Sequence, residues 1–142
     1  MRKLTPIVAS AVLGACAVQA NQPPEEEGGP NVTIVGDTAF LELPVGRSAD
    51  NGELRVTFEN VSEDSRCPAG VQCVWEGNAS IRVTVEMGNE SQVAILNSTL
   101  NPQRASFFGY TIGYRDLSPY PVADTPHDPG DYRATISVLD TR

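Results

Sequence analysis

The sequence is poor in positive charge. Lys3 is its only lysine, and the chain beyond Lys3 has eight arginines against all 18 acidic residues, so the 142-residue protein carries a formal net charge of −8. Binding of nucleic acid requires a basic surface that neutralises phosphates, and electrostatic docking on anionic lipid headgroups requires one too. The composition therefore argues against both kinds of partner, and the acidity favours solubility.

Groups that perform acid–base or nucleophilic chemistry are also scarce. His127 is the only histidine, and it lies in a proline-rich acidic segment, residues 124–131, where we expect it to be solvated. No serine has the G-x-S-x-G context of a nucleophile elbow. The aspartates of 124–131 lack the spacing of a helix–loop–helix calcium site, and a zinc or copper site built from Cys67, Cys73 and His127 would need reduced thiols. We therefore expect no catalytic site, no cofactor and no metal.

Sustained helical periodicity is absent, and the 11 prolines are scattered through the connections. Apolar and polar residues alternate instead, which is typical of strands with one buried face. The predicted strand regions are 32–34, 39–43, 54–59, 79–87, 93–96, 107–114 and 132–138. About seven or eight short strands in one domain, residues 31–142, predict an all-β, antiparallel two-sheet sandwich of the immunoglobulin-like type.

The N-terminus has an apolar run, Leu4 to Leu13, which is shorter than the roughly 20 residues of a membrane-spanning helix. Leu13-Gly14-Ala15-Cys16 follows and resembles the lipobox of bacterial lipoproteins, in which cleavage precedes the cysteine and its thiol receives a diacylglycerol. The resemblance implies that 1–15 is a lipoprotein signal peptide and that lipidated Cys16 anchors the protein to a membrane of the cell envelope. Because Ala17 is not aspartate, we expect the outer membrane in a Gram-negative host.

Two alternatives remain open for this segment. Val18-Gln19-Ala20 would serve as an ordinary secretory cleavage site, which would discard Cys16, or Cys16 is an incidental apolar residue. All four lipobox positions match, so we favour lipidation. Residues 16–30 then form a tether, because proline, glycine and three adjacent glutamates without apolar periodicity are typical of a disordered spacer.

The segment from Asp64 to Ala79 reads D-S-R-C-P-A-G-V-Q-C-V-W-E-G-N-A and lies between two strong strand patterns. Exported proteins meet oxidising conditions, so we expect a disulfide between Cys67 and Cys73. Trp75, the only tryptophan, is expected to pack its apolar surface beside this disulfide. Gly77 is expected to permit a tight turn into the strand that begins at Ala79.

These residues resemble the signature D-S-R-C-P-x-x-V-x-C-x-W-x-G-x-A, found in a family of uncharacterised small exported bacterial proteins and lipoproteins. The likeness extends over most of the region from Leu54 to Val138, including Leu117-Ser118-Pro119-Tyr120-Pro121. The resemblance implies export and a similar fold. It implies no activity.

Asp64, Arg66 and Trp75 are the candidate interaction residues of this loop. In a purely structural interpretation, Asp64 caps the turn and Arg66 pairs with an acid or stacks on Trp75. In a functional interpretation, Arg66 projects from a rigid loop toward a partner. The first hypothesis for function is a non-enzymatic binding or structural module that meets a protein or glycan through loops at one end of the sandwich. The alternatives are a protease inhibitor that presents Arg66 to a trypsin-like cleft and, more weakly, a hydrolase that uses His127.

Overall fold

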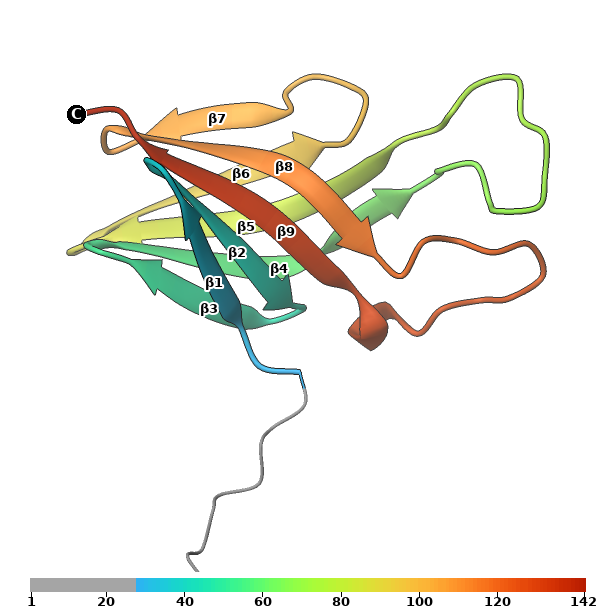
Figure 1. Cartoon of the computed structure of the whole chain (residues 1–142), viewed down its shortest axis with the longest axis horizontal. Coiled ribbons are helices and arrows are strands. Elements are labelled where there is room, and N and C mark those ends of the chain that lie inside the picture. Colours follow the sequence, from blue (N-terminus) through green and yellow to red (C-terminus); the bar gives the residue numbers. More distant parts are fainter. Residues whose placement is uncertain (1–27) are drawn as a thin grey trace, which may run out of the picture.

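The computed structural model describes residues 28–142, which form two antiparallel β-sheets packed face to face (Figure 1). The strands are β1 (Asn31–Val35), β2 (Thr38–Pro44), β3 (Arg47–Asn51), β4 (Leu54–Asp64), β5 (Ala79–Met87), β6 (Glu90–Asn97), β7 (Arg104–Phe107), β8 (Tyr110–Ser118) and β9 (Arg133–Asp140). A short 3₁₀ helix, η1 (Pro129–Asp131), precedes β9. The predicted all-β sandwich is therefore confirmed, with nine strands where seven or eight were expected.

The strand order follows the chain closely. One sheet has the order β3-β4-β5-β6, and the other has the order β1-β2-β9-β8-β7. Neighbouring strands are therefore also neighbours in sequence, except where β9 returns to pair with β2. The chain passes from one sheet to the other between β2 and β3 and returns between β6 and β7, so the whole β3-β4-β5-β6 sheet separates β2 from its neighbour β9 in sequence.

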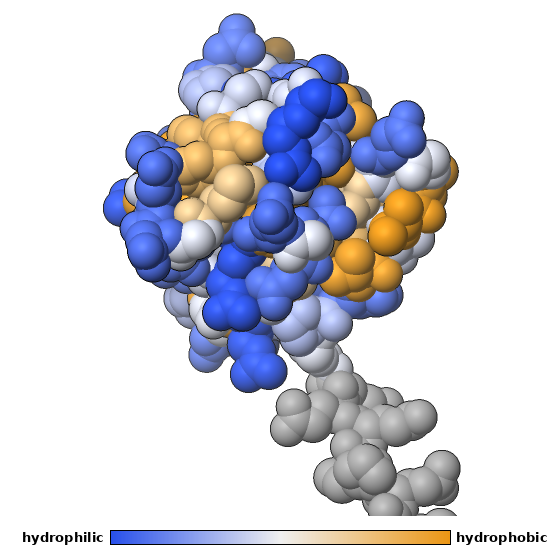
Figure 2. All heavy atoms as spheres, turned by 90° about the vertical axis from the view of Figure 1, so that its left-hand side faces the viewer, coloured by the Kyte–Doolittle hydropathy of each residue, from blue (hydrophilic) through white to orange (hydrophobic). Residues whose placement is uncertain are grey.

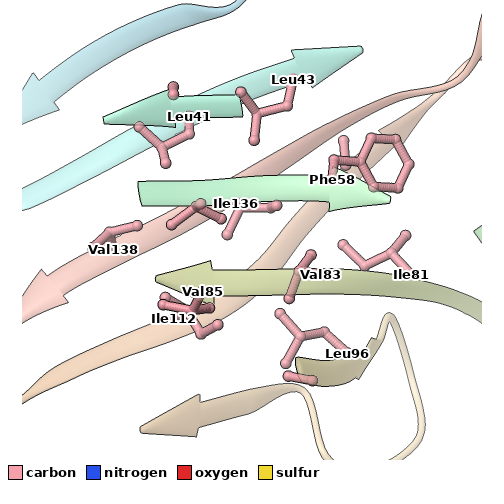
Figure 3. Packing of buried hydrophobic residues seen from close by; sticks show 14 of the residues in the cluster. Leu41, Leu43, Phe58, Ile81, Val83, Val85, Leu96, Ile112, Ile136 and Val138 are labelled. Carbon is pink, nitrogen blue, oxygen red and sulfur yellow. The ribbon is translucent and has the colours of Figure 1, made fainter. Parts of the chain in front are cut away.

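The core lies between the two sheets and is built by the alternation seen in the sequence. Leu41 and Leu43 of β2 face Phe58 of β4, and all three are fully buried. Figure 3 shows side chains from both sheets meeting between the ribbons. Because successive strand residues point to opposite faces, the polar residues between them, such as Arg55, lie on the outer surface.

Two features of the strand pattern were not anticipated. β3 contains a single buried residue, Ala49, so its alternation is too weak to distinguish it from the turns around it. The aromatic-rich region 107–114 is not one strand, because Phe108 and Gly109, both with positive φ, form the turn between β7 and β8.

The structure describes the chain from Gly28 onward, and β1 begins at Asn31. The predicted signal peptide, Cys16 and most of the predicted tether lie outside the described residues. Among residues 28–142, no helix is long and apolar enough to cross a membrane.

Candidate functional site

Two long loops extend from the same end of the sandwich (Figure 1, green and orange at the right). One comprises residues 65–78, between β4 and β5, and the other comprises residues 119–132, between β8 and β9. They contact each other directly, since the Ala69 amide donates to the Pro121 carbonyl at 2.9 Å. The Tyr120 hydroxyl also donates to the Cys67 carbonyl at 2.9 Å. The two loops therefore make one surface, which we call the loop platform (residues 65–78 and 119–132).

The disulfide between Cys67 and Cys73 is confirmed, with an S–S distance of 2.11 Å. It closes the outer part of the 65–78 loop. Below it, the two arms of the loop are paired by backbone hydrogen bonds from Ser65 N to Asn78 O at 2.7 Å and from Cys67 N to Glu76 O at 2.9 Å. The arms thus continue the β4–β5 pairing outward, and the disulfide fixes the far end.

Arg66 connects the loop to the neighbouring sheet. Its side chain is buried, with 8% of the residue exposed, and its Nε and Nη2 donate to the two oxygens of Asp64 at 2.8 and 2.7 Å. Its remaining donors reach the carbonyls of Leu117 at 2.5 Å and Pro119 at 3.0 Å. The guanidinium also lies 5.0 Å from the centroid of the Tyr120 ring. A single side chain therefore holds both halves of the platform together.

Asp64 and Arg66 keep their charges in this buried setting. Burial by itself would raise the pKa of Asp64, but hydrogen bonds from Arg66 and from the Tyr132 hydroxyl outweigh it and hold that pKa below its usual range. Burial acts to lower the pKa of Arg66, and the hydrogen bonds to Asp64 reverse this. Burial raises the pKa of nearby Tyr114 to about 12. Its hydroxyl is therefore neutral at pH 7 and does not compete with Asp64 for the charge of Arg66. The cluster is a satisfied ion pair.

This ion pair makes the free energy of unfolding depend on pH in the acidic range. Because the pKa of Asp64 is lower in the folded protein, its contribution is present above the unfolded-state pKa and is lost as pH falls through the folded value. We expect the free energy of unfolding to drop below about pH 4. In Asp64→Asn the drop should be smaller. Urea unfolding at a series of pH values from neutral to strongly acidic would measure both, and parallel curves for the two proteins would contradict this role.

A second buried network lies at the base of the loop, and sequence reasoning missed it. Asn78 is completely buried. Its Nδ2 donates to Asn97 Oδ1 at 3.0 Å, and its Oδ1 accepts from the amide of Thr99 at 3.1 Å. Asn78 Oδ1 also accepts from the Leu100 amide at 3.3 Å, so one buried side chain satisfies two backbone groups of the 97–100 turn.

Trp75 is only partly covered, because 54% of the residue is exposed. Arg66 stacks on Tyr120 rather than on Trp75. Five exposed apolar side chains lie on the loop platform, and we call them the apolar tip: Val71, Val74, Trp75, Tyr120 and Val122.

The buried position of Arg66 also bears on the inhibitor hypothesis. A trypsin-like cleft would have to receive an extended arginine side chain, but the donors of Arg66 are all directed at Asp64 and at two carbonyls inside the protein. The geometry matches the structural interpretation of Asp64 and Arg66. It offers no support for the projecting arginine that inhibition would require.

His127 belongs to the loop platform and is half-buried, whereas the sequence predicted a solvated side chain. Its Nε2 is 3.1 Å from the Tyr120 carbonyl, and its ring meets Tyr132 edge to face at 6.4 Å. Asp128, in the same acidic segment, caps η1 by accepting from the Gly130 amide at 2.9 Å. Among residues 28–142, no group of three or more acidic, cysteine or histidine side chains is arranged to hold a metal ion.

Removal of the disulfide should loosen the platform without unfolding the sandwich. We expect Cys67→Ser/Cys73→Ser to lower the free energy of unfolding by about 2 kcal/mol, the chain-entropy value for so short a loop. The Arg66 contacts and the backbone pairs at the loop base remain in this variant. Urea unfolding followed by circular dichroism measures the loss, and reduction of the unaltered protein is the matched comparison. Loss of the strand signal in native buffer would show instead that the disulfide is required for folding.

The fold and this end of the molecule define an antiparallel β-sandwich with a disulfide-closed loop platform and an apolar tip. A scan against protein-family models, a search of curated proteins and a search of solved structures each returned no match.

Proposed function

We propose that this protein is a non-enzymatic binding module that uses the apolar tip of its loop platform. The observation that carries the proposal is the exposure of Trp75 and Val74 on a disulfide-closed loop that contacts a second loop, which carries exposed Tyr120 and Val122. Apolar groups gathered on a surface mark interaction sites more often than single exposed residues do. Tryptophan and tyrosine are also the residues that most often dominate binding energy.

Rigidity supports the same conclusion. The platform is fixed by the disulfide at its tip, by the Arg66 contacts across the two loops, and by the Asn78 network at its base. A preordered surface loses little conformational entropy when a partner binds. A loop that served only as a connection would not need to hold apolar side chains in water in this way.

Exposed apolar residues also occur at β1, where Val32, Ile34 and Val35 belong to an edge strand. Figure 2 shows the end of the sandwich opposite the platform, where strongly apolar groups lie on one side. Val35 lies in the turn region of β1 and β2, away from the loop platform. It therefore provides a control for apolar contact as such.

Site-specific photo-crosslinking tests the proposal. A benzoylphenylalanine residue replaces Val74 in one variant of the full chain and Val35 in another, and both are irradiated in intact cells. We expect a discrete covalent adduct from position 74 and none of the same mass from position 35. Adducts from both positions alike, or from neither, would contradict a binding role for the tip.

We further propose that the module acts in the cell envelope, held by a lipid on Cys16. The support is the complete match of Leu13-Gly14-Ala15-Cys16 to a lipobox, together with a disulfide that an oxidising compartment favours. Cys16→Ser should move the protein from the membrane fraction to the soluble fraction, as judged by fractionation and immunoblotting. Continued membrane association of this variant would rule out the anchor.

A further inference from the structure

The exposed charges of the loop platform are all negative, whereas the rest of the protein surface carries charges of both signs. The loop platform carries four exposed carboxylates, Glu76, Asp124, Asp128 and Asp131. Its only arginine is Arg66, which is buried and neutralised by Asp64 at 2.7 Å. Residues 65–78 and 119–132 therefore contain no exposed lysine or arginine. The exposed charged side chains of the loop platform, which we call the rim, are therefore all negative.

A hollow of about 280 Å³ lies beside the tip. Glu76 of the disulfide-closed loop and Asp116 of β8 line it, together with Tyr120 and two arginines, Arg66 and Arg115. Both guanidinium groups already have partners, because that of Arg66 is in the buried ion pair and lies 5.0 Å from the centroid of the Tyr120 ring, and that of Arg115 lies over a phenylalanine ring at 5.8 Å. Carboxylates bind guanidinium and ammonium, so Glu76 and Asp116 are the groups of this hollow that a cation of the partner would meet.

We infer that the partner is a protein whose surface is basic and presents apolar side chains, and that a lysine or arginine of this partner enters the hollow beside Glu76. This inference rests on the proposed function. Apolar side chains of the partner cover the tip, and its positive charge complements the rim. Complementary charge of this kind raises the rate of association and selects the partner.

The chemistry of the tip favours a protein over the other ligands. Three of its five members are valines, which pack against apolar side chains and offer nothing to sugar hydroxyls. An anionic membrane surface would be repelled by the carboxylate rim and by the net charge of −8. A basic, apolar protein surface satisfies both the tip and the rim.

Trp75 provides the measurement, because it is the only tryptophan in the chain and is half exposed. The full-length protein is titrated with three short synthetic peptides: one of lysine and leucine, one of glutamate and leucine, and one of lysine and serine. We expect a blue shift of the Trp75 emission with the lysine–leucine peptide, and binding at least about tenfold weaker with each of the other two. The binding should weaken as salt is added.

Variants separate the two parts of the interaction, with affinity measured by calorimetry. Val74→Ser should weaken binding of the lysine–leucine peptide. Val35→Ser, the matched control at the opposite end of the sandwich, should leave this binding unchanged. Glu76→Gln/Asp116→Asn should weaken it about 5- to 10-fold. The control for this pair is Glu90→Gln, which lies in the turn between β5 and β6 at the opposite end.

Each outcome decides between the proposals. Equal binding of the lysine–leucine and glutamate–leucine peptides would overturn the basic partner and leave the binding module in place. A Trp75 shift produced by chito- or malto-oligosaccharides or by neutral phosphatidylcholine vesicles, with no peptide bound, would also overturn a protein partner and leave the tip as a binding site. Absence of a shift with every one of these probes would count against the tip itself, and both proposals would fail.

Discussion

Arg66→Ala should lower the free energy of unfolding by about 3–5 kcal/mol, the range for breaking a buried ion pair by removal of one partner. The substitution leaves the nearly buried Asp64 carboxylate with the Tyr132 hydroxyl and the backbone amide of residue 66 as its remaining donors. It also removes the donors to the carbonyl of Leu117 in β8 and to that of Pro119, the first residue of the second loop. Urea unfolding followed by circular dichroism measures the loss.

The Asp64→Asn/Arg66→Ala double variant is the matched control. If Arg66 acts through its pairing with Asp64, removal of the charge at position 64 should relieve part of the penalty, so the double variant should be less destabilised than the sum of the single variants. Additive losses would show that the contacts of Arg66 with the two carbonyls dominate. A loss below about 1 kcal/mol in Arg66→Ala would place this residue among ordinary surface ion pairs and would contradict the structure.

Gly77→Ala should be destabilising by about 2–5 kcal/mol, the combined cost of a left-handed conformation and of overpacking. Gly77 has φ of +79°, and a Cβ at this position would overlap the backbone of Ser65 and Arg66. Backbone atoms cannot move aside as a flexible side chain can. The pairing of the two loop arms must therefore open, which also shifts Arg66. Thermal and urea unfolding would measure the effect.

Gly70→Ala in the same loop is the control. Gly70 also has a positive φ, +86°, but a Cβ there would meet nothing within 4 Å. In this variant the free energy of unfolding should fall only by the cost of placing alanine in a left-handed conformation, about 1–2 kcal/mol. Similar losses at positions 70 and 77 would mean that steric overlap at Gly77 contributes nothing. A native-like Gly77→Ala protein would show that the two loop arms are not held as closely as the structure has them.

Much of the fold was predictable because its signals are local. The alternation at 54–58 and 79–87 places the apolar residues on one face, and the structure buries all of them except Met87, which is partly buried. The disulfide was predictable because Cys67 and Cys73 are the only cysteines beyond Cys16. β3 was missed because Ala49 alone faces the core, so the segment gives no periodicity to read.

The site was less predictable, since its contacts are distant in sequence. Arg66 donates to the backbone carbonyl of Leu117, 51 residues away. Every residue has a backbone carbonyl, so the amino-acid sequence gives no sign of this contact. Trp75 was expected beside the disulfide because it follows Cys73 by two residues and carries a large apolar surface. Its exposed fraction of 54% shows that the loop leaves about half of this residue in water.

The sequence by itself determined that this protein has a sandwich of antiparallel strands and one closed loop, because strand alternation and cysteine spacing act over a few residues. Only the tertiary structure decided which side chains of that loop face inward. Arg66 turned inward because Asp64, the Leu117 carbonyl of β8 and the Pro119 carbonyl satisfy its donors there. Val74 and Trp75 lie in the outer part of the loop, outside both sheets, and they remain exposed to water.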